Sequence, residues 1–258
     1  MTKAVILAGG KGTRIAEETG LRPKPMITIG TEPILWHVMK IYGSHGIKDF
    51  VICCGHKGWV IRDYFLDYLM NRSDFTVDVS TSEIEIHDSR TEPWRVTLID
   101  TGEETMTGGR LKRVREHLDR EEHFLFTYGD GVGNIDVTDT VRFHKEHGKK
   151  ATLVATFPPG RFGALNLNGD RVTEFKEKPK GDGSRVNGGF FVLEPSVIDL
   201  IDDDHTTWEE EPLIELAQSG ELMAYRHDGF WQPMDNLRDK NFLNELWESG
   251  QAPWKLWE

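Results

Sequence analysis

Apolar and polar residues along the chain follow two spacings, one typical of buried strands and one typical of helices. Helical spacing of apolar residues occurs from Ile34 to His45 and again from Trp59 to Met70. Short apolar runs predict strands buried on both faces, at Ala4 to Leu7, Phe50 to Cys54, Phe124 to Thr127 and Thr152 to Thr156. This alternation predicts an α/β fold with a mostly parallel, doubly wound (Rossmann-like) sheet, whose ligands bind at the carboxyl ends of the strands.

Two regions depart from this alternation. Apolar and polar residues alternate singly from Phe75 to Ile99, including Val96 and Leu98, which predicts antiparallel hairpins. The segment from Phe162 to Val192 predicts short strands and turns, with Asn168-Gly169 as a hairpin turn. We expect the second region to be a small insertion on the main sheet, within a single domain that spans residues 1–258.

A glycine-rich loop follows the first predicted strand. Gly9, Gly10 and Gly12 allow close approach of the backbone to a ligand and turns at positive φ. Backbone N–H groups exposed in such a loop, followed by a helix N-terminus, bind anions. Arg14 and Lys24 add two cationic groups suited to phosphate oxygens, so this part of the chain is predicted to bind a polyphosphate.

Two commoner glycine motifs do not match this loop, and a plain strand-to-helix turn remains the alternative. No Lys-Ser or Lys-Thr follows the last glycine, as a P-loop requires. Ile15 stands where the third glycine of a dinucleotide-binding fingerprint belongs. Pro23 and Pro25 fix the backbone on both sides of Lys24, as expected for a lysine that must be aimed at a ligand.

Charge and cysteine content restrict the classes of function. The 31 basic and 43 acidic residues give a formal net charge of −12, which argues against nucleic acid or an anionic membrane as a partner. Phosphate groups must therefore meet a local positive site and a metal ion. Cys53 and Cys54 are adjacent within an apolar run, which indicates buried thiols and a reducing cytoplasm. No apolar run has the length of a transmembrane helix, and the N-terminus lacks a signal peptide's apolar region.

The glycine loop and its neighbours resemble the sugar-1-phosphate nucleotidylyltransferases. The resemblance extends over essentially the whole chain and rests on four motifs: Leu7-Ala8-Gly9-Gly10-Lys11-Gly12-Thr13-Arg14 with Lys24-Pro25-Met26, Phe126-Thr127-Tyr128-Gly129-Asp130-Gly131, Glu177-Lys178-Pro179, and Asn187-Gly188-Gly189-Phe190. Four further segments resemble the branch that transfers a cytidylyl group to glucose 1-phosphate: Glu92-Pro93-Trp94, Thr107 to Val114, Phe157 to Gly163, and Trp231-Gln232-Pro233-Met234-Asp235.

The resemblance implies a reaction and a division of the domain. CTP and α-D-glucose 1-phosphate would give CDP-glucose and pyrophosphate, the first step towards CDP-linked dideoxyhexoses of bacterial surface polysaccharide (lipopolysaccharide, O antigen). Residues 1–150 would bind the nucleotide, 151–235 the sugar, and 236–258 would form a C-terminal segment. A homo-oligomer is expected. The same transfer with UTP or dTTP, or a catalytically silent regulatory relative, remain as alternatives.

The resemblance also implies a magnesium site. A phosphate monoester is already an anion near neutral pH, so the enzyme needs no general base but must neutralise charge and align two anions. Mg²⁺ is usually held by one or two carboxylates and phosphate oxygens. Asp130 and Asp235 match the family's metal positions. The alternative for each aspartate is an Asx-turn or a helix N-cap.

Other roles are implied residue by residue. Catalytic roles fall to Arg14, on the departing pyrophosphate, and to Lys24, near the reaction centre. The nucleotide would be bound by Leu7, Ala8, Gly9, Gly10, Lys11, Gly12, Thr13, Arg14, Lys24, Thr105, Arg110 and Gly129. The sugar phosphate would be bound by Glu177, Lys178, Asn187 and Gly188, with Trp208 or Trp231 as possible pocket walls. Discrimination between cytosine and uracil is expected from a backbone carbonyl near Leu7 to Gly10.

Overall fold

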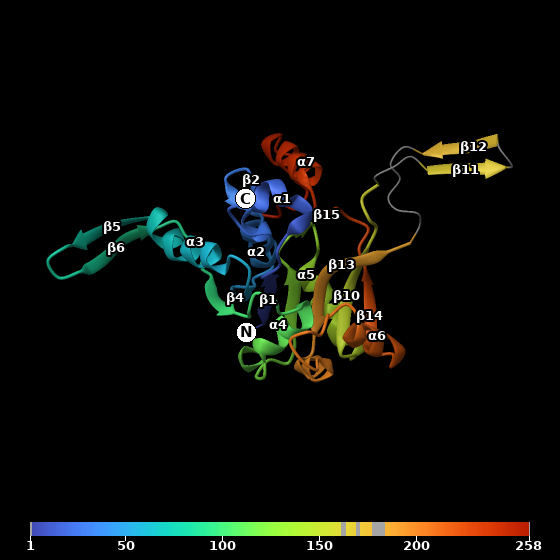
Figure 1. Cartoon of the computed structure of the whole chain (residues 1–258), viewed down its shortest axis with the longest axis horizontal. Coiled ribbons are helices and arrows are strands. Elements are labelled where there is room, and N and C mark those ends of the chain that lie inside the picture. Colours follow the sequence, from blue (N-terminus) through green and yellow to red (C-terminus); the bar gives the residue numbers. More distant parts are fainter. Residues whose placement is uncertain (1, 161–163, 169–170, 177–183, 258) are drawn as a thin grey trace.

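A seven-stranded sheet forms the centre of the molecule. Figure 1 shows the computed structural model, which describes residues 2–160, 164–168, 171–176 and 184–257. Within these residues the strand order is β14-β10-β13-β8-β1-β4-β7, and β13 alone runs antiparallel to its neighbours. The strands are β1 (Lys3–Ala8), β4 (Asp49–Cys54), β7 (Arg95–Asp100), β8 (Phe124–Tyr128), β10 (Ala151–Thr156), β13 (Val186–Leu193) and β14 (Leu222–Arg226).

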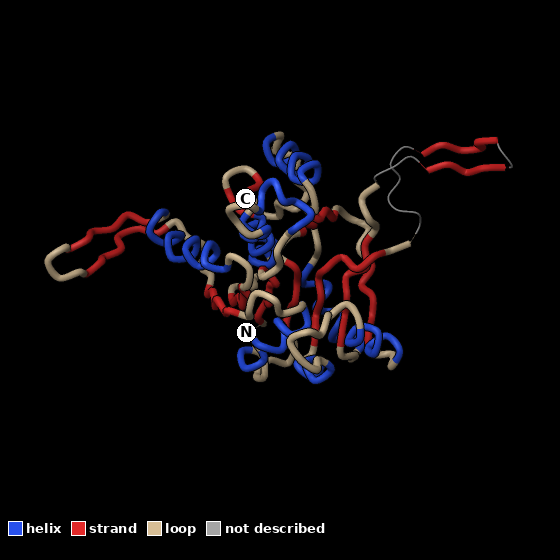
Figure 2. The backbone as a smooth tube through the Cα atoms, viewed as in Figure 1, coloured by secondary structure: helices blue, strands red, loops and turns tan. Residues whose placement is uncertain are grey.

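Helices and short turns connect these strands (Figure 2). The α-helices are α1 (Ala16–Thr19), α2 (Ile34–Ser44), α3 (Gly58–Asn71), α4 (Thr107–Arg113), α5 (Val137–His147), α6 (Glu211–Gln218) and α7 (Leu237–Glu248). The 3-10 helices are η1 (Thr13–Ile15), η2 (Lys24–Met26), η3 (Arg115–His117) and η4 (Pro195–Leu200).

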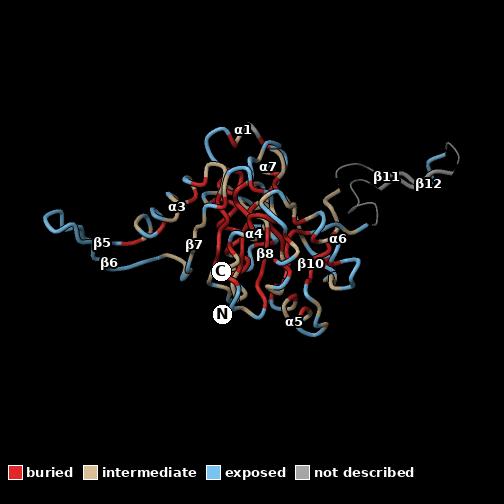
Figure 3. Tube along the Cα trace, turned by 60° about the horizontal axis from the view of Figure 1, so that its bottom comes forward, coloured by how far each residue is buried: buried red, intermediate tan, exposed pale blue. Residues whose placement is uncertain are grey.

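Two apolar cores lie on opposite faces of the sheet. Ile6 of β1 packs in the core that contains α2, whereas Leu7 packs in the core that contains residues of α4 and α6. Successive side chains of a strand point to opposite faces, so a strand that is apolar throughout can be covered on both. The predicted doubly wound fold is therefore confirmed, and Figure 3 shows the buried centre in red.

The order in which strands are added to the sheet reverses beside β1. β4 pairs with one edge of β1 and β8 pairs with the other edge, and both pairs are parallel. Loops that leave neighbouring parallel strands at such a switch point diverge and leave a crevice between them. Gly129, just after β8, donates its N–H to the carbonyl of Leu7 over 2.9 Å, so the ends of β8 and β1 lie together.

In the described part of the chain, four two-stranded ribbons accompany the main sheet. They are β2 (Thr28–Ile29) with β3 (Glu32–Pro33), β5 (Ser73–Asp78) with β6 (Glu83–Ser89), β9 (Gly131–Gly133) with β15 (Trp231–Pro233), and β11 (Ala164–Asn168) with β12 (Arg171–Lys176). The β9–β15 pair matters most for the site, because it joins the turn after β8 to the C-terminal part of the chain.

The structure corrects the predicted hairpin region in one respect. Residues 73–89 do form a hairpin, but Val96 and Leu98 belong to β7, which extends the main sheet parallel to β4. Alternating apolar residues specify a strand with one buried face and do not specify its partner. The hairpin predicted around Asn168 is present as β11–β12, although its turn lies outside the described residues.

Candidate active site

A cavity of about 680 Å³ opens at the carboxyl ends of β1 and β8. Its walls come from the glycine loop, the start of α4, the turn after β8, the start of β13 and the end of β15. Most of the predicted site residues line it: Leu7, Ala8, Gly9, Gly10, Gly12, Thr13, Arg14, Lys24, Thr105, Arg110, Gly129, Asp130, Asn187, Gly188 and Asp235. The fold thus brings together residues that lie up to 228 positions apart between Leu7 and Asp235.

Three predicted residues are not part of the described cavity wall. Lys11 lies on the loop, but its Nζ donates to Glu104 Oε1 over 2.7 Å on the exposed surface. This ion pair raises the pKa of Lys11 above its ordinary value. Glu177 and Lys178 lie outside the described residues.

The loop glycines serve different physical needs. Gly12 adopts a φ of 63°, a left-handed conformation that favours glycine. A Cβ at Gly9 would lie 2.2 Å from a guanidinium nitrogen of Arg110, so this glycine makes room for a side chain of the protein. A Cβ at Gly10 would meet nothing within 4 Å, and this residue faces open space beside the cavity.

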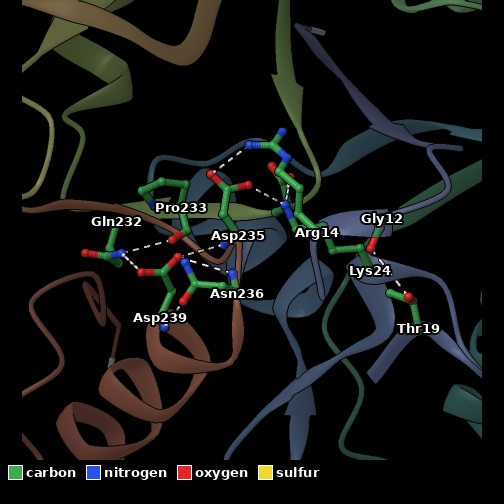
Figure 4. Close-up of polar contacts among 10 residues, drawn as sticks. Gly12, Arg14, Thr19, Lys24, Gln232, Pro233, Asp235, Asn236 and Asp239 are labelled. Atoms are coloured by element: carbon green, nitrogen blue, oxygen red, sulfur yellow. Dashed lines mark hydrogen bonds and ion pairs between the residues drawn. The ribbon is translucent and has the colours of Figure 1, made fainter. Parts of the chain in front are cut away.

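Lys24 lies between the two predicted metal-binding carboxylates. Its Nζ donates to Asp130 Oδ2 over 2.6 Å and to Asp235 Oδ1 over 2.8 Å, and its side chain is only 8% exposed. Arg14 contacts the other oxygen of Asp235 over 3.2 Å while its own side chain is 76% exposed (Figure 4). Burial alone would lower the pKa of Lys24, but both aspartates raise it, and the net pKa lies above its ordinary value.

Backbone pairing brings Asp130 and Asp235 together. Pro233 of β15 pairs with Gly131 of β9, and the N–H of Met234 donates to the carbonyl of Asp130 over 2.8 Å. Asp130 directly precedes β9, and Asp235 follows β15 after Met234. Their convergence is therefore built into the ribbon and does not depend on Lys24 alone.

The carboxylate of Asp235 is not the cap of the helix that follows it. Asn236 caps α7, and Asp239 accepts hydrogen bonds from the backbone N–H groups of Asp235 and Asn236 over 3.0 and 3.2 Å. The capping role considered for Asp235 is therefore wrong. Its side chain points instead toward Lys24 and Arg14 (Figure 4).

The two carboxylates fit a hard divalent cation. One lysine nitrogen reaches both, so they are close enough to share an ion. Among the described residues, no group of three or more histidine, cysteine, aspartate or glutamate side chains could hold a metal. An ion at Asp130 and Asp235 would need further oxygens from a ligand and water, which is the mode that Mg²⁺ prefers.

Arg110 lines the cavity, yet its guanidinium already makes several hydrogen bonds within the protein. Nη1 donates to Cys54 O, Thr101 Oγ1 and Gly102 O, and Nη2 donates to Gly9 O and Glu103 O, over 2.7 to 3.3 Å. All five acceptors are uncharged, and the residue is 4% exposed. Burial accordingly lowers the pKa of Arg110 from its ordinary value. The side chain clamps the glycine loop to the 101–103 loop.

Sequence reasoning did not select Tyr128, Glu209 and Thr107, which also line the cavity. The hydroxyl of Tyr128 donates to Glu209 Oε1, and Thr107 Oγ1 donates to Glu209 Oε2 over 2.6 Å. Trp231, considered as a pocket wall, does line the cavity, whereas Trp208 is fully buried. The Glu209 side chain carries no local motif, so only its position after the buried Trp208 could have drawn attention to it.

The chain is similar to a family model and to several curated proteins. The model described as nucleotidyl transferase matches residues 3–233. A glucose-1-phosphate cytidylyltransferase of Salmonella typhimurium is 65% identical over 256 residues, which cover 99% of this chain and 100% of that protein. A probable glucose-1-phosphate cytidylyltransferase of Bacillus subtilis is 43% identical over the same length and coverage. A mannose-1-phosphate guanyltransferase of Yarrowia lipolytica is 29% identical, over 94% of this chain and 62% of that protein.

A solved structure shares the fold. The crystal structure of HddC from Yersinia pseudotuberculosis superimposes with a TM-score of 0.71, at 21% identity, over 96% of this chain and 100% of that one. At this level of identity the likeness concerns the fold alone. No helix among the described residues is long and apolar enough to cross a membrane.

Proposed function

The chain belongs to the nucleotidyl transferase family, and from this premise we propose that it transfers the cytidylyl group of CTP to α-D-glucose 1-phosphate. The products are CDP-glucose and pyrophosphate. The choice of substrates is supported by the 65% identity to the Salmonella enzyme over nearly the full chain. The assignment as a metal-assisted nucleotidyl transfer is supported mainly by the pair of carboxylates on either side of Lys24 in the cavity.

The reaction makes one bond and breaks another at the α-phosphorus of CTP. An oxygen of glucose 1-phosphate attacks this phosphorus, and the bond to the bridging oxygen of the pyrophosphate group breaks. The nucleophile is already anionic, so the chain needs no general base. What the protein must supply is alignment of two repelling anions and stabilisation of the departing charge.

The charged groups of the site explain the need for a metal. Lys24 and Arg14 carry two positive charges, and Asp130 and Asp235 carry two negative charges, so this cluster is formally neutral. A neutral cluster does not offset the charge of a triphosphate and a sugar phosphate. Asp130 and Asp235 would hold Mg²⁺, which would supply the missing positive charge, and Lys24 and Arg14 beside them would contact phosphate oxygens.

The two ends of the cavity take the two halves of the product. The glycine loop, Thr105 and the residues clamped by Arg110 support binding of the nucleotide. Asn187 and Gly188 support binding of the sugar, and Trp231 fixes this wall because its Nε1 donates to Gly188 O over 2.7 Å. The roles of Glu177 and Lys178 in holding the sugar phosphate stay predictions, as does the division of the domain into nucleotide and sugar parts.

A pyrophosphate-release assay tests the proposed function. CTP, UTP, dTTP, ATP and GTP are each combined with glucose 1-phosphate and with other sugar 1-phosphates, with and without Mg²⁺. We expect the highest kcat/KM with CTP and glucose 1-phosphate. A preference for UTP or dTTP would move the enzyme to another branch of the family, and no release with any pair would indicate a silent relative.

The β5–β6 hairpin supports the proposal that the enzyme is a homo-oligomer. Phe75 pairs with Ile86 and Val77 with Ile84, which places four apolar side chains on one face of a ribbon, each between 40% and 54% exposed. An isolated two-stranded ribbon is marginally stable in water. Figure 3 shows this hairpin as an exposed arm, and burial against a second copy would stabilise it. Light scattering of the parent and of I84D would test this, with a smaller particle expected for I84D.

The product and the cysteines agree with a bacterial biosynthetic role in the cytoplasm. Cys53 and Cys54 are free and buried, as in proteins of a reducing compartment. CDP-glucose would be used for CDP-linked dideoxyhexoses of surface polysaccharide, as the resemblance implies. Metabolite analysis of a strain without this enzyme would show whether that product is lost.

A further inference from the structure

The Glu209 carboxylate joins two walls of the cavity that belong to different parts of the chain. Its Oε2 accepts from Thr107 Oγ1 over 2.6 Å, and Thr107 is the first residue of α4. Its Oε1 accepts from the hydroxyl of Tyr128, the last residue of β8. Glu209 is only partly buried and lines the cavity between these two partners.

The position of Glu209 is fixed by its neighbours. Trp208, the residue before it, is fully buried and packs against the rings of Phe126 and Phe191 at centroid distances of 5.8 and 6.0 Å. The N–H of Trp208 donates to Thr107 Oγ1 over 2.9 Å. Thr107 Oγ1 therefore accepts from Trp208 and donates to Glu209, so both hydrogen bonds have a defined direction.

Tyr128 connects Glu209 to the sugar side of the cavity. Its hydroxyl faces both Glu209 and the side chain of Asn187. Its ring packs on Gly189, where the φ is +76° and an added Cβ would lie 2.5 Å from the ring. The glycine thus lets the ring lie against the start of β13, and the hydroxyl that contacts Glu209 also faces Asn187 in the same cavity wall.

A carboxylate at this position is suited to hydroxyl groups and unsuited to phosphate. Two anions repel each other, and a cavity built for polyphosphates gains nothing from an additional negative group beside them. An ionised carboxylate offers about four lone-pair positions and accepts hydrogen bonds only. The hydrogen bonds from Thr107 and Tyr128 use two of these positions. The remaining capacity suits neutral donors, of which a hexose provides several.

We propose that Glu209 is a sugar-specificity residue, which accepts a hydrogen bond from a hydroxyl of the hexose bound beside Asn187 and Gly188. The inference rests on the proposed function, because it assumes that the sugar phosphate binds at this end of the cavity. A hexose that lacks the hydroxyl leaves the carboxylate without that donor. A hydrogen bond to a charged group contributes about 1.5–3 kcal/mol, which corresponds to roughly 10- to 100-fold in kcat/KM.

The test combines a change of the protein with changes of the sugar. The kcat/KM is measured for glucose 1-phosphate and for its 2-, 3-, 4- and 6-deoxy analogues, in the parent enzyme and in E209Q. We expect the parent to lose about 10- to 100-fold with at least one analogue. In E209Q the kcat/KM values for that same analogue and for glucose 1-phosphate should differ about 10-fold less than in the parent, because the neutral amide oxygen accepts a weaker hydrogen bond than the carboxylate. The KM for CTP should change less than twofold.

T107V is the matched control. It removes one support of the carboxylate but keeps the carboxylate itself, so the parent's loss with the critical analogue should persist. Identical deoxy ratios in the parent and E209Q would overturn the proposal. An equal rise of the KM values for CTP and glucose 1-phosphate in E209Q would also overturn it, since that result indicates a purely structural tie.

Failure of the inference about Glu209 can be distinguished from failure of the proposed function. If the parent released no pyrophosphate from CTP and glucose 1-phosphate, the proposed function would fail, and calorimetric binding of glucose 1-phosphate and its analogues would carry the test of Glu209. If E209Q does not fold, E209D replaces it, because a carboxylate shortened by one methylene withdraws the acceptor while it keeps the charge. The same collapse of one deoxy ratio is then expected.

Discussion

Lys24 and Arg110 are two buried cations in one cavity, and their surroundings differ in kind. Lys24 is held by two carboxylates, which are themselves predicted to bind a metal. Arg110 is held by four backbone carbonyls and one hydroxyl, all of them uncharged. The first cation has partners that an arriving ligand can replace, whereas the second has its hydrogen bonds committed to the fold.

The difference between the two cations suggests that one takes part in the reaction and the other stabilises the loops around the same site. Phosphate and metal binding require charged groups that exchange partners, and we propose that Lys24 with Asp130 and Asp235 forms such a group. The loop proposed to surround the nucleotide requires a fixed backbone, and Arg110 holds Gly9 O on one side and Gly102 O on the other. Mutations of the two cations should therefore have different signatures.

The largest effect is expected from the carboxylates. D130N and D235N should each lower kcat by at least about 100-fold, because each removes a negative ligand of the metal and leaves the charge of the phosphates uncompensated. Steady-state pyrophosphate release measures this, and EDTA should abolish turnover of the parent. D202N, at an exposed position outside the cavity, is the matched control and should be as active as the parent. Near-normal turnover of D130N or D235N would remove that residue from the metal site.

Replacement of Lys24 should lower kcat by about 100-fold and also reveal the repulsion between its partners. K24A removes an interaction with charge that develops in the transition state, so kcat falls more than the KM values rise. In EDTA the two carboxylates then face each other with only the exposed Arg14 beside Asp235, and the free energy of unfolding should drop by about 1–3 kcal/mol. Thermal unfolding should show a larger stabilisation by Mg²⁺ in K24A than in the parent. Equal stabilisation of both proteins would contradict the exchange of partners.

Replacement of Arg110 should mainly lower the free energy of unfolding. R110A removes one donor from five acceptors, of which Cys54 O and Gly9 O keep backbone N–H donors. We therefore expect a loss of about 1–3 kcal/mol in urea unfolding. The kcat/KM values for CTP and UTP should fall by similar factors, because the side chain fixes the loop and does not distinguish the bases. A variant that loses activity with CTP but keeps it with UTP would show that Arg110 recognises the base directly.

The smallest change in the free energy of unfolding is expected from replacement of Arg14. Its side chain is largely exposed and contacts Asp235 over 3.2 Å, and exposed ion pairs contribute about 0–1 kcal/mol. R14A should unfold at nearly the same urea concentration as the parent, yet lower kcat by roughly 10-fold through weaker contact with the departing pyrophosphate. A large loss of stability in R14A would place this residue with Arg110 instead of Lys24.

Much of the site was visible in the sequence because its motifs are local. The glycine loop, Lys24 between two prolines and Asp130 after a buried strand each combine a backbone requirement with a chemical one within a few residues. Asp235 was selected through a resemblance, since a lone aspartate after Pro-Met has several possible roles. The β9–β15 ribbon, which carries it to Asp130, is too short to be recognised from apolar periodicity.

Other residues could not be assigned from the sequence for physical reasons. Arg110 was expected to face the nucleotide. Nothing in the sequence around it indicates that its guanidinium donates to five acceptors, two of them far away in the chain and three in the 101–103 loop. Val96 and Leu98 have the alternation of a hairpin strand, although β7 pairs in parallel with β4. Glu209 has no motif, because its partners Thr107 and Tyr128 are 102 and 81 positions away.

The sequence by itself predicted the strands β1, β4, β8 and β10, the helices α2 and α3, the doubly wound class and the glycine loop, because periodicity and glycine conformations act over short stretches of chain. The tertiary structure decided which charged groups meet. Whether a carboxylate contacts a lysine or a hydroxyl depends on strand pairing across more than a hundred residues, and electrostatic energies depend on distance in space and on burial. Lys24, Arg110 and Glu209 are each a single ionisable residue in the sequence, and only their folded surroundings give them three different roles.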